Sequence, residues 1–185
     1  MGGRDLFVTL STARIRLEPI REHHAPGMHD VLIDASLYRY MLSEVPPDVA
    51  WLRERYRSLE AGWSPDRTQR WLNWVVVERG TPIGYVQATV ASGGGYATLG
   101  WTIGSRWQGR GFAREAVQAV CAHLLSAGVG ELRATIDARN DRSIGVAERV
   151  GFRRVDTRRS DDVIDGVRGI DHDYVLREGD LASGG

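Results

Sequence analysis

Gln108-Gly109-Arg110-Gly111-Phe112-Ala113 is the stretch of sequence that decides the fold. It follows a run from Ala97 to Ile103 that alternates polar and apolar residues, which is typical of a β-strand. After it, apolar residues at steps of three and four predict an amphipathic helix over 113–124. Such a junction can bind an anion, because the first turn of a helix has unpaired backbone N–H groups and partial positive charge. Taken alone, it is as typical of a tight turn without a ligand.

Periodicity and turn residues predict helices and strands along the rest of the chain. The expected strands are 14–18, 71–78, 83–90, 97–103, 132–136, 152–159 and 170–176, and the expected helices are 23–34, 46–62, 113–124 and 140–150. A polar loop, 161–166, is expected between the last two strands. Because helices and strands interleave around one sheet, the predicted class is α/β (α+β).

Composition limits the classes of protein that the chain can belong to. With 185 residues, 42% hydrophobic and 26% charged, it is typical of one globular domain spanning 1–185. Lys+Arg and Asp+Glu are both 24, so no excess of positive charge points to nucleic acid as a partner. No apolar run predicts a membrane span, and the N-terminus lacks the pattern of a signal peptide. A single cysteine, Cys121, rules out an internal disulfide and suits a cytoplasmic location.

Several motifs occur together in an order that resembles the GNAT (GCN5-related N-acetyltransferase) superfamily. Gln-x-x-Gly-x-Ala, starting at Gln108, is similar to the coenzyme A signature of that family, and it lies between a strand and a helix as the family requires. Four further segments fit the family pattern: Thr12–Leu17, Ile83–Tyr85, Gly100–Ile103, and Asn140-x-x-Ser143 with Gly151-Phe152 downstream. The resemblance covers about 12–176 and is closest to the RimJ/RimL-like branch, whose members acetylate ribosomal-protein N-termini or small amines.

The resemblance implies a fold and a coenzyme site. The fold is a mixed, twisted sheet of six or seven strands with helices on both faces. The backbone of Trp101, Thr102 and Ile103 is expected to pair with the pantetheine arm of acetyl-CoA, and one of these amides to stabilise the oxyanion. Residues 108–113 are expected to hold the pyrophosphate, and Asn140 to hydrogen-bond the pantetheine. No metal is expected in the reaction.

The general acid implied by the resemblance is Ser143. Many GNAT members have a tyrosine near the end of the Asn140 helix, facing the departing thiolate, but this chain has Ala147 there. Ser143 lies four residues earlier on the same helix face, and in the RimJ/RimL-like branch a serine at that position serves the thiolate. The alternative is that the Ser143 hydroxyl only caps the helix.

The group that accepts the amine proton is predicted with less support. An amine must be neutral to attack the thioester, and a carboxylate could take its proton, directly or through water. The branch can place an acidic residue after the Phe152 strand, so Asp162 is the preferred candidate, with Glu44 and Asp137 as rivals. For each of the three, an ordinary solvated charge is the alternative.

Other reactive side chains are expected to be structural. His23, His24 and His29 have no cysteine or carboxylate cluster near them in sequence, so a solvated helix is favoured over a metal site. Cys121 falls on the apolar stripe of its helix and is expected in the core. His172 lies in a strand-like run and could line the acceptor site, although a structural place is favoured.

The sequence thus predicts an acyl-CoA-dependent N-acyltransferase that moves an acetyl group to a primary amine by direct attack in a ternary complex. The acceptor is a protein N-terminus or a small amine, and neither the acceptor nor the acyl length is decided. A non-catalytic module that senses acyl-CoA is the alternative from another class, supported by the missing tyrosine at Ala147. The oligomeric state, a homodimer included, stays open.

Overall fold

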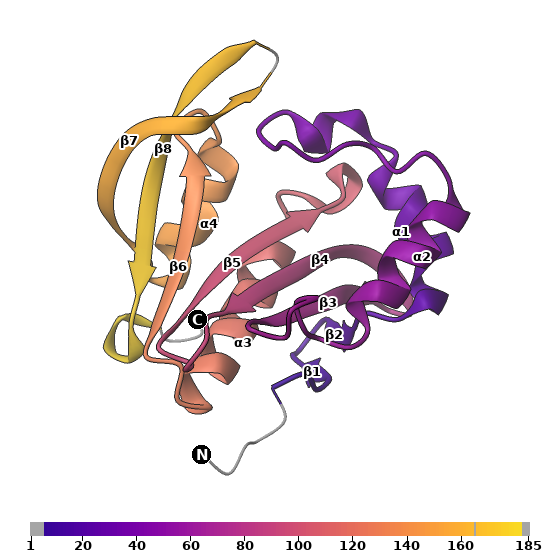
Figure 1. The fold of residues 1–185 in the computed structure, drawn as a ribbon, viewed down its shortest axis with the longest axis horizontal. Helices are drawn as coiled ribbons and strands as arrows, with labels where there is room; N and C mark the ends of the chain where they lie inside the picture. The colour runs from indigo at the N-terminus through magenta and orange to yellow at the C-terminus, as the bar shows by residue number, and fades with distance from the viewer. Residues whose placement is uncertain (1–5, 165, 183–185) are drawn as a thin grey trace.

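The computed structural model describes residues 6–164 and 166–182, which form a single eight-stranded sheet with helices on both faces (Figure 1). The strand order is β1-β2-β3-β4-β5-β6-β8-β7, and β5 and β6 form a parallel pair while the other neighbours are antiparallel. The strands are β1 Leu10–Ser11, β2 Arg16–Pro19, β3 Arg70–Glu78, β4 Thr81–Val90, β5 Tyr96–Ile103, β6 Glu131–Asp137, β7 Arg153–Ile164 and β8 Val167–Leu176. The helices are α1 Ala25–Leu32, α2 Val49–Leu59, α3 Phe112–Ser126 and α4 Asp141–Val150, with short 3-10 turns η1 Glu22–His24, η2 Ala35–Tyr38, η3 Ser105–Trp107 and η4 Glu178–Asp180.

The predicted mixed α/β class is confirmed, with eight strands where six or seven were expected. The additional strand, β1, has only two residues, which is too short for any alternation to show in the sequence. Residues outside 12–176 also pack against the core, among them Leu6 and Leu181. No helix among residues 6–164 and 166–182 is long and apolar enough to cross a membrane.

The centre of the sheet is buried on both faces, and β3 shows why. Leu72, Trp74 and Val76 join the cluster that packs against α3 and α4, while Val75 and Val77 join the cluster that contains α1 and α2. Successive strand residues point to opposite faces. The run Trp74-Val75-Val76-Val77 is therefore continuously apolar because helices cover both sides.

The predicted polar loop at 161–166 is wrong for the residues that the structure describes. β7 continues to Ile164 and β8 begins at Val167, so 161–164 belong to a long hairpin; Asp165 lies outside the described residues. β7 is the edge strand of the sheet, and most of its side chains are exposed on both faces. A strand with no buried face has no hydrophobic alternation, so its charged sequence resembled a loop.

The helix predicted over 23–34 is shorter than expected. It divides into η1 and α1, and Pro26 lies in the first turn of α1, where the missing N–H costs nothing. The turn η2 that follows was not predicted. Asp34 begins η2, because its side chain accepts a hydrogen bond from the backbone amide of Ser36.

Candidate active site

The two parallel strands at the centre of the sheet separate along their length. β5 and β6 are paired at Tyr96–Glu131, Ala97–Leu132 and Thr98–Arg133, and the described residues beyond Thr98 and Arg133 are not paired between these strands. Beyond this point β5 keeps its other partner, β4, as far as Ile103, and Figure 1 shows the two strands diverging toward their carboxyl ends. Residues 99–103 of β5 and 134–137 of β6, which we call the splayed segments, are therefore not paired with each other, and on that side the β5 backbone has no strand partner among the described residues.

A helix begins shortly after each splayed segment. α3 follows β5 and begins after Gly111, and α4 follows β6 and begins after Asn140. The side chain of Gln108 ties them together: its Nε2 donates to the carbonyl of Ile103 at 2.8 Å, and its Oε1 accepts from Arg142 on α4. Both helix N-termini, with their partial positive charge, are thus brought to the carboxyl ends of the diverging strands.

The loop before α3 has the geometry of an open backbone cradle. Gly109 and Gly111 adopt φ of 75° and 83°, values that other residues rarely adopt. Among the described residues, a Cβ on Gly109 would meet nothing within 4 Å, and one on Gly111 would meet only Arg14, at 3.3 Å. No side chain from the same set of residues caps the start of α3. The backbone of this loop is accordingly exposed, and binding of the pyrophosphate by residues 108–113 stays a prediction.

Asn140 and Ser143 have different roles at the start of α4. Asn140 Oδ1 accepts a hydrogen bond from the backbone amide of Ser143 at 3.2 Å, so Asn140 is the N-cap. Ser143 lies in the first turn and is half-buried, and its hydroxyl makes no hydrogen bond within the described part of the chain. The capping role that competed with catalysis for Ser143 thus belongs to Asn140. Ala147, one turn on, is fully buried in the core.

Thr102 of β5 contacts the phenol of Tyr85 on the neighbouring strand β4. Thr102 is buried and lies opposite Tyr85 of β4, while Trp101 is half-buried and Ile103 buried. Burial raises the pKa of the Tyr85 phenol, and a hydrogen bond with Thr102 opposes that rise. Tyr85 therefore stays a neutral phenol beside the splayed segment of β5. Sequence reasoning did not select it, because nothing local distinguishes it from a core aromatic.

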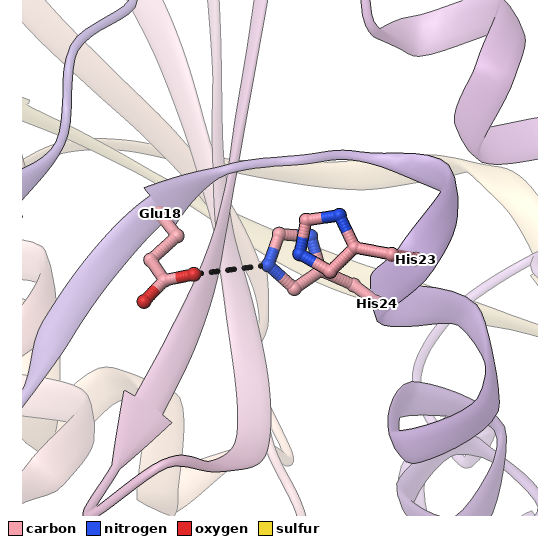
Figure 2. Close-up of side chains that lie close together, drawn as sticks. All are labelled: Glu18, His23 and His24. Carbon is pink, nitrogen blue, oxygen red and sulfur yellow. Dashed lines mark hydrogen bonds and ion pairs between the residues drawn. The ribbon is translucent and has the colours of Figure 1, made fainter.

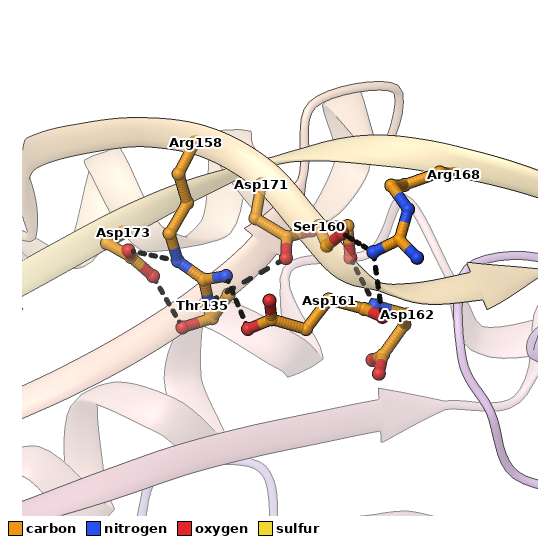
Figure 3. A network of polar contacts seen from close by, with 8 residues as sticks. All are labelled: Thr135, Arg158, Ser160, Asp161, Asp162, Arg168, Asp171 and Asp173. Atoms are coloured by element: carbon orange, nitrogen blue, oxygen red, sulfur yellow. Dashed lines mark hydrogen bonds and ion pairs between the residues drawn. The ribbon is translucent and has the colours of Figure 1, made fainter.

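A network of charged side chains connects β6 to the β7–β8 hairpin (Figure 3). Thr135, in the splayed segment of β6, donates to Asp173 at 2.6 Å, and Arg158 Nε donates to the same carboxylate at 3.0 Å. Arg158 also forms an ion pair with Asp161 at 3.0 Å. Carboxylates outnumber arginines in this network, although across the described residues of the two strands arginines and aspartates are equal in number.

Asp162 lies on β7 in an irregular stretch where the register shifts between Arg159 and Val163. Its backbone amide donates to Ser160 Oγ at 3.2 Å, and its exposed carboxylate points away from the Arg158 network (Figure 3). Within the described residues this carboxylate has no ion pair, so it is available to a ligand or to water.

The two rival carboxylates are in different situations. Asp137 ends β6 with a side chain only 6% exposed, and it makes a two-point contact with Arg139 at 2.9 and 2.6 Å. Hydrogen bonds from Arg139 hold the pKa of Asp137 below its usual range, with burial opposing them. A carboxylate held in this way is a poor proton acceptor. Glu44 is exposed in the segment between η2 and α2.

Three residues expected to be unrelated lie close together at the opposite side of the sheet from the hairpin. Ligand atoms of Glu18, His23 and His24 fall within 4.8 Å of one another (Figure 2). The expectation of a solvated helix is wrong for His24, which is buried, and Glu18 lies beside it because the chain turns back after β2.

The hydrogen bonds of His24 nevertheless disfavour a metal. Its Nδ1 accepts from the Arg21 amide at 3.0 Å, so Nε2 carries the proton that it shares with Glu18 at 3.1 Å. Burial lowers the pKa of His24, which keeps the ring neutral and in this tautomer. With one nitrogen accepting and the other protonated, His24 has no lone pair free for an ion. The Glu18–His24 pair instead fastens η1 to β2.

Cys121 is fully buried on α3, and burial raises the pKa of its thiol, which opposes a nucleophilic role. His172 makes contacts with Thr157 at 3.0 Å and Arg154 at 3.3 Å, both on β7, and so has the structural place that was favoured for it.

Comparison with known proteins identifies the family. The model of the acetyltransferase (GNAT) domain matches residues 14–153, which is most of the chain. The chain belongs to the GNAT acetyltransferase family. No curated protein matches the chain.

Solved GNAT structures have the same fold. RimL, a ribosomal L7/L12 α-N-protein acetyltransferase solved with coenzyme A, is 16% identical with a TM-score of 0.82, and the match covers 91% of this chain and 97% of that one. The ribosomal-protein-S5-alanine acetyltransferase of Vibrio fischeri is 17% identical with a TM-score of 0.81, covering 95% and 100%. The microcin C7 self-immunity acetyltransferase MccE, solved with acetyl-CoA and AMP, is 16% identical with a TM-score of 0.81, covering 94% and 99%. RimJ/RimL-type enzymes are thus among the structures that this GNAT chain resembles, as its motifs predicted.

Proposed function

We propose that this GNAT chain is an acyl-CoA-dependent N-acyltransferase that moves an acetyl group from acetyl-CoA to a primary amine. The observation that carries the proposal is the divergence of β5 and β6 next to the open start of α3. A strand with one free side can pair with an extended amide-bearing arm, and an uncapped helix start can bind a pyrophosphate. Coenzyme A has both groups, one after the other, and the relatives RimL and MccE were solved with it or its acetyl form.

In this proposal each predicted donor-site residue has a defined place. Trp101, Thr102 and Ile103 lie along the pantetheine, and residues 108–113 hold the pyrophosphate. Asn140 Oδ1 already accepts the helix-cap hydrogen bond, so its side-chain nitrogen is the group proposed to donate to the pantetheine. The loop glycines let the main chain approach the phosphates closely.

The reaction that this arrangement supports is direct attack of the amine on the thioester. A backbone amide of the splayed β5 segment would stabilise the oxyanion, and the Ser143 hydroxyl, which has no partner within the described residues, would hydrogen-bond the departing thiolate. A thiol pKa of ~8.5 makes the thiolate a tolerable leaving group, so the Ser143 hydroxyl needs to give the thiolate little stabilisation. This explains how the site can do without a tyrosine at Ala147.

The acceptor is proposed to be an amine drawn in by the exposed Asp162 carboxylate of the β7–β8 hairpin. A free α-amino group has a pKa of about 7.7–8.0, so some of it is neutral at pH 7, whereas a lysine at about 10.4 is almost entirely charged. The exposed Asp162 carboxylate would attract the cation and relay its proton to water. A protein N-terminus, the acceptor type named for RimL, and a small cationic amine both fit this chemistry.

The experiment that tests the function measures free thiol released from acetyl-CoA in the presence of a panel of amines, with calorimetric titration of CoA in parallel. We expect CoA binding, and thiol release that depends on one class of amine. Binding without release for any amine would favour the acyl-CoA sensor, and a protein that binds no CoA would exclude both functions. Peptides with free or blocked N-termini, compared with polyamines, would separate the two acceptor classes.

A further inference from the structure

The loop before α3 is held from outside by a residue near the N-terminus of the chain. Arg14, just before β2, donates from Nη1 to the carbonyl of Arg110 at 3.0 Å, across 96 residues of sequence. Its Nε and Nη2 both contact Glu115 Oε2, at 2.7 and 2.6 Å. Its guanidinium lies 4.8 Å from the centre of the Phe112 ring. One side chain thus touches the loop, the first residue of α3 and the first turn of that helix.

The contact with Arg110 fixes the orientation of one peptide group. In a trans peptide the C=O and the following N–H point in opposite directions. With the Arg110 carbonyl directed at Arg14, the Gly111 N–H is directed away from Arg14. A flip of this peptide is easy for glycine, which tolerates many backbone conformations. After a flip the N–H would face a guanidinium, which has only donors, so Arg14 opposes the flip.

Glu115 holds Arg14 in place and is itself held. Its Oε1 accepts from Thr12 Oγ1 at 2.5 Å and from the Arg14 amide at 3.1 Å. Burial raises the pKa of Glu115, but these hydrogen bonds and Arg14 outweigh it and lower the pKa, so the side chain is a carboxylate at neutral pH. A carboxylate in the first turn of α3 would repel a phosphate nearby, and Arg14 cancels that charge.

We propose that Arg14, held by Glu115 and Thr12, is a positioning residue that fixes the Arg110–Gly111 peptide for binding of the coenzyme pyrophosphate. This rests on the proposed function, since it takes residues 108–113 as the pyrophosphate site. Arg14 acts through the loop backbone and through Glu115. The effect is therefore confined to ligands that carry the pyrophosphate.

The test compares three ligands: CoA, dephospho-CoA, which lacks only the 3′-phosphate, and pantetheine, which lacks the pyrophosphate and the adenosine as well. Arg14→Gln is expected to raise the Kd for CoA and for dephospho-CoA by the same factor, about 10–50-fold, and to leave the Kd for pantetheine unchanged. Arg14→Lys keeps the charge but cannot reach Glu115 and Arg110 together, so an intermediate rise of about 3–10-fold is expected. The matched control is Arg16→Gln, on the adjoining strand, where the ion pair that Arg16 makes among the described residues is with Glu18.

Each other outcome overturns the inference. An equal loss for pantetheine would show general damage to the fold, and a loss for CoA alone would place Arg14 at the 3′-phosphate. Arg14 variants with the affinity of the wild type, in a protein that binds CoA, would remove the inference and leave the proposed function intact. If the wild-type protein bound pantetheine as tightly as dephospho-CoA, the pyrophosphate would add no affinity. That result would contradict the assignment of residues 108–113 and this inference with it.

Discussion

The loop before α3 follows β5 and the β7–β8 hairpin pairs with β6, so the two regions adjoin the diverging strands from opposite sides. They differ in the chemical groups that they present. In the loop the groups available to a ligand belong to the backbone. They are glycines with positive φ, an uncapped helix start and peptide groups held by Gln108 and Arg14. In the hairpin the groups available to a ligand are side chains. They are carboxylates and arginines on an exposed edge strand with an irregular register. A phosphate bound by backbone depends on the shape of the main chain, whereas an amine bound by carboxylates depends on charge.

This difference predicts that the two regions respond differently to substitution. Backbone geometry is set by a few glycines and one helix start, so it survives changes in most side chains. The hairpin can exchange charged residues with little effect on the core, because its side chains are exposed. Substitutions in the loop should therefore have larger effects on ligand binding than substitutions in the hairpin.

The largest effect is expected for Gly111→Glu. The new side chain would be strained at φ 83°, would meet Arg14 and would put a negative charge where the pyrophosphate is proposed to bind. We expect at least about a 100-fold rise in the Kd for CoA by titration calorimetry. Gly128→Glu is the matched control, since Gly128 has φ 92° at the other end of α3 with nothing within 4 Å. Equal CoA affinity in the two folded variants would contradict the backbone account.

A smaller effect, on turnover alone, is expected for Ser143→Ala. If the hydroxyl meets the thiolate in the transition state, kcat falls by about 10–100-fold while the Kd for acetyl-CoA stays the same. Because Asn140 caps α4, the melting temperature should not change. The control is Ser58→Ala on the exposed face of α2. A drop in stability with unchanged kcat would assign Ser143 to helix structure after all.

Sequence patterns predicted the loop far better than the hairpin, for a physical reason. The strand, the glycines and the apolar stripe of α3 are consecutive, so their roles follow from local conformation. Arg14 meets Glu115 across 101 residues, and Glu18 meets His24 only because the chain turns back on itself, so neither contact is visible locally. The 161–164 strand was missed because an edge strand exposed on both faces has no hydrophobic alternation.

A moderate effect is expected for Asp162→Asn, which tests the hairpin. If Asp162 relays the amine proton, kcat/KM falls by about 3–10-fold at neutral pH, and the defect shrinks as pH approaches the amine pKa, about 7.7–8.0 for an α-amino group. If Asp162 only attracts the cation, the loss lies in KM and fades with added salt. Asp161→Asn is the neighbouring control, because Asp161 is paired with Arg158.

A pH–rate profile at two ionic strengths separates these outcomes. An Asp162 variant that matches the wild type under every condition would mean that the hairpin carboxylate plays no part. In that event Glu44, which is exposed between η2 and α2, becomes the next carboxylate to test.

The smallest effect on turnover, less than about 3-fold, is expected for Asp137→Asn, because Asp137 is bound by Arg139 and is not free to accept a proton. Its effect should appear in stability. Hydrogen bonds from Arg139 lower its pKa in the folded protein, so between that pKa and the unfolded value of about 3.9 the unfolded chain binds more protons. The contribution is therefore complete above about pH 3.9 and is lost as pH falls through the lowered pKa.

Urea unfolding measures that contribution directly. At pH 7 the Asp137→Asn variant should lose about 1–3 kcal/mol of unfolding free energy, the range for a hydrogen bond to a charged group, and the difference from the wild type should shrink toward pH 3. Asp30→Asn, an exposed position on α1, is the control and should show little change at either pH. A large fall in kcat for Asp137→Asn, with stability intact, would mean that the splayed segment of β6 supplies the proton acceptor. The acceptor side would then depend on a buried, fixed group, and the contrast between the loop and the hairpin would no longer hold.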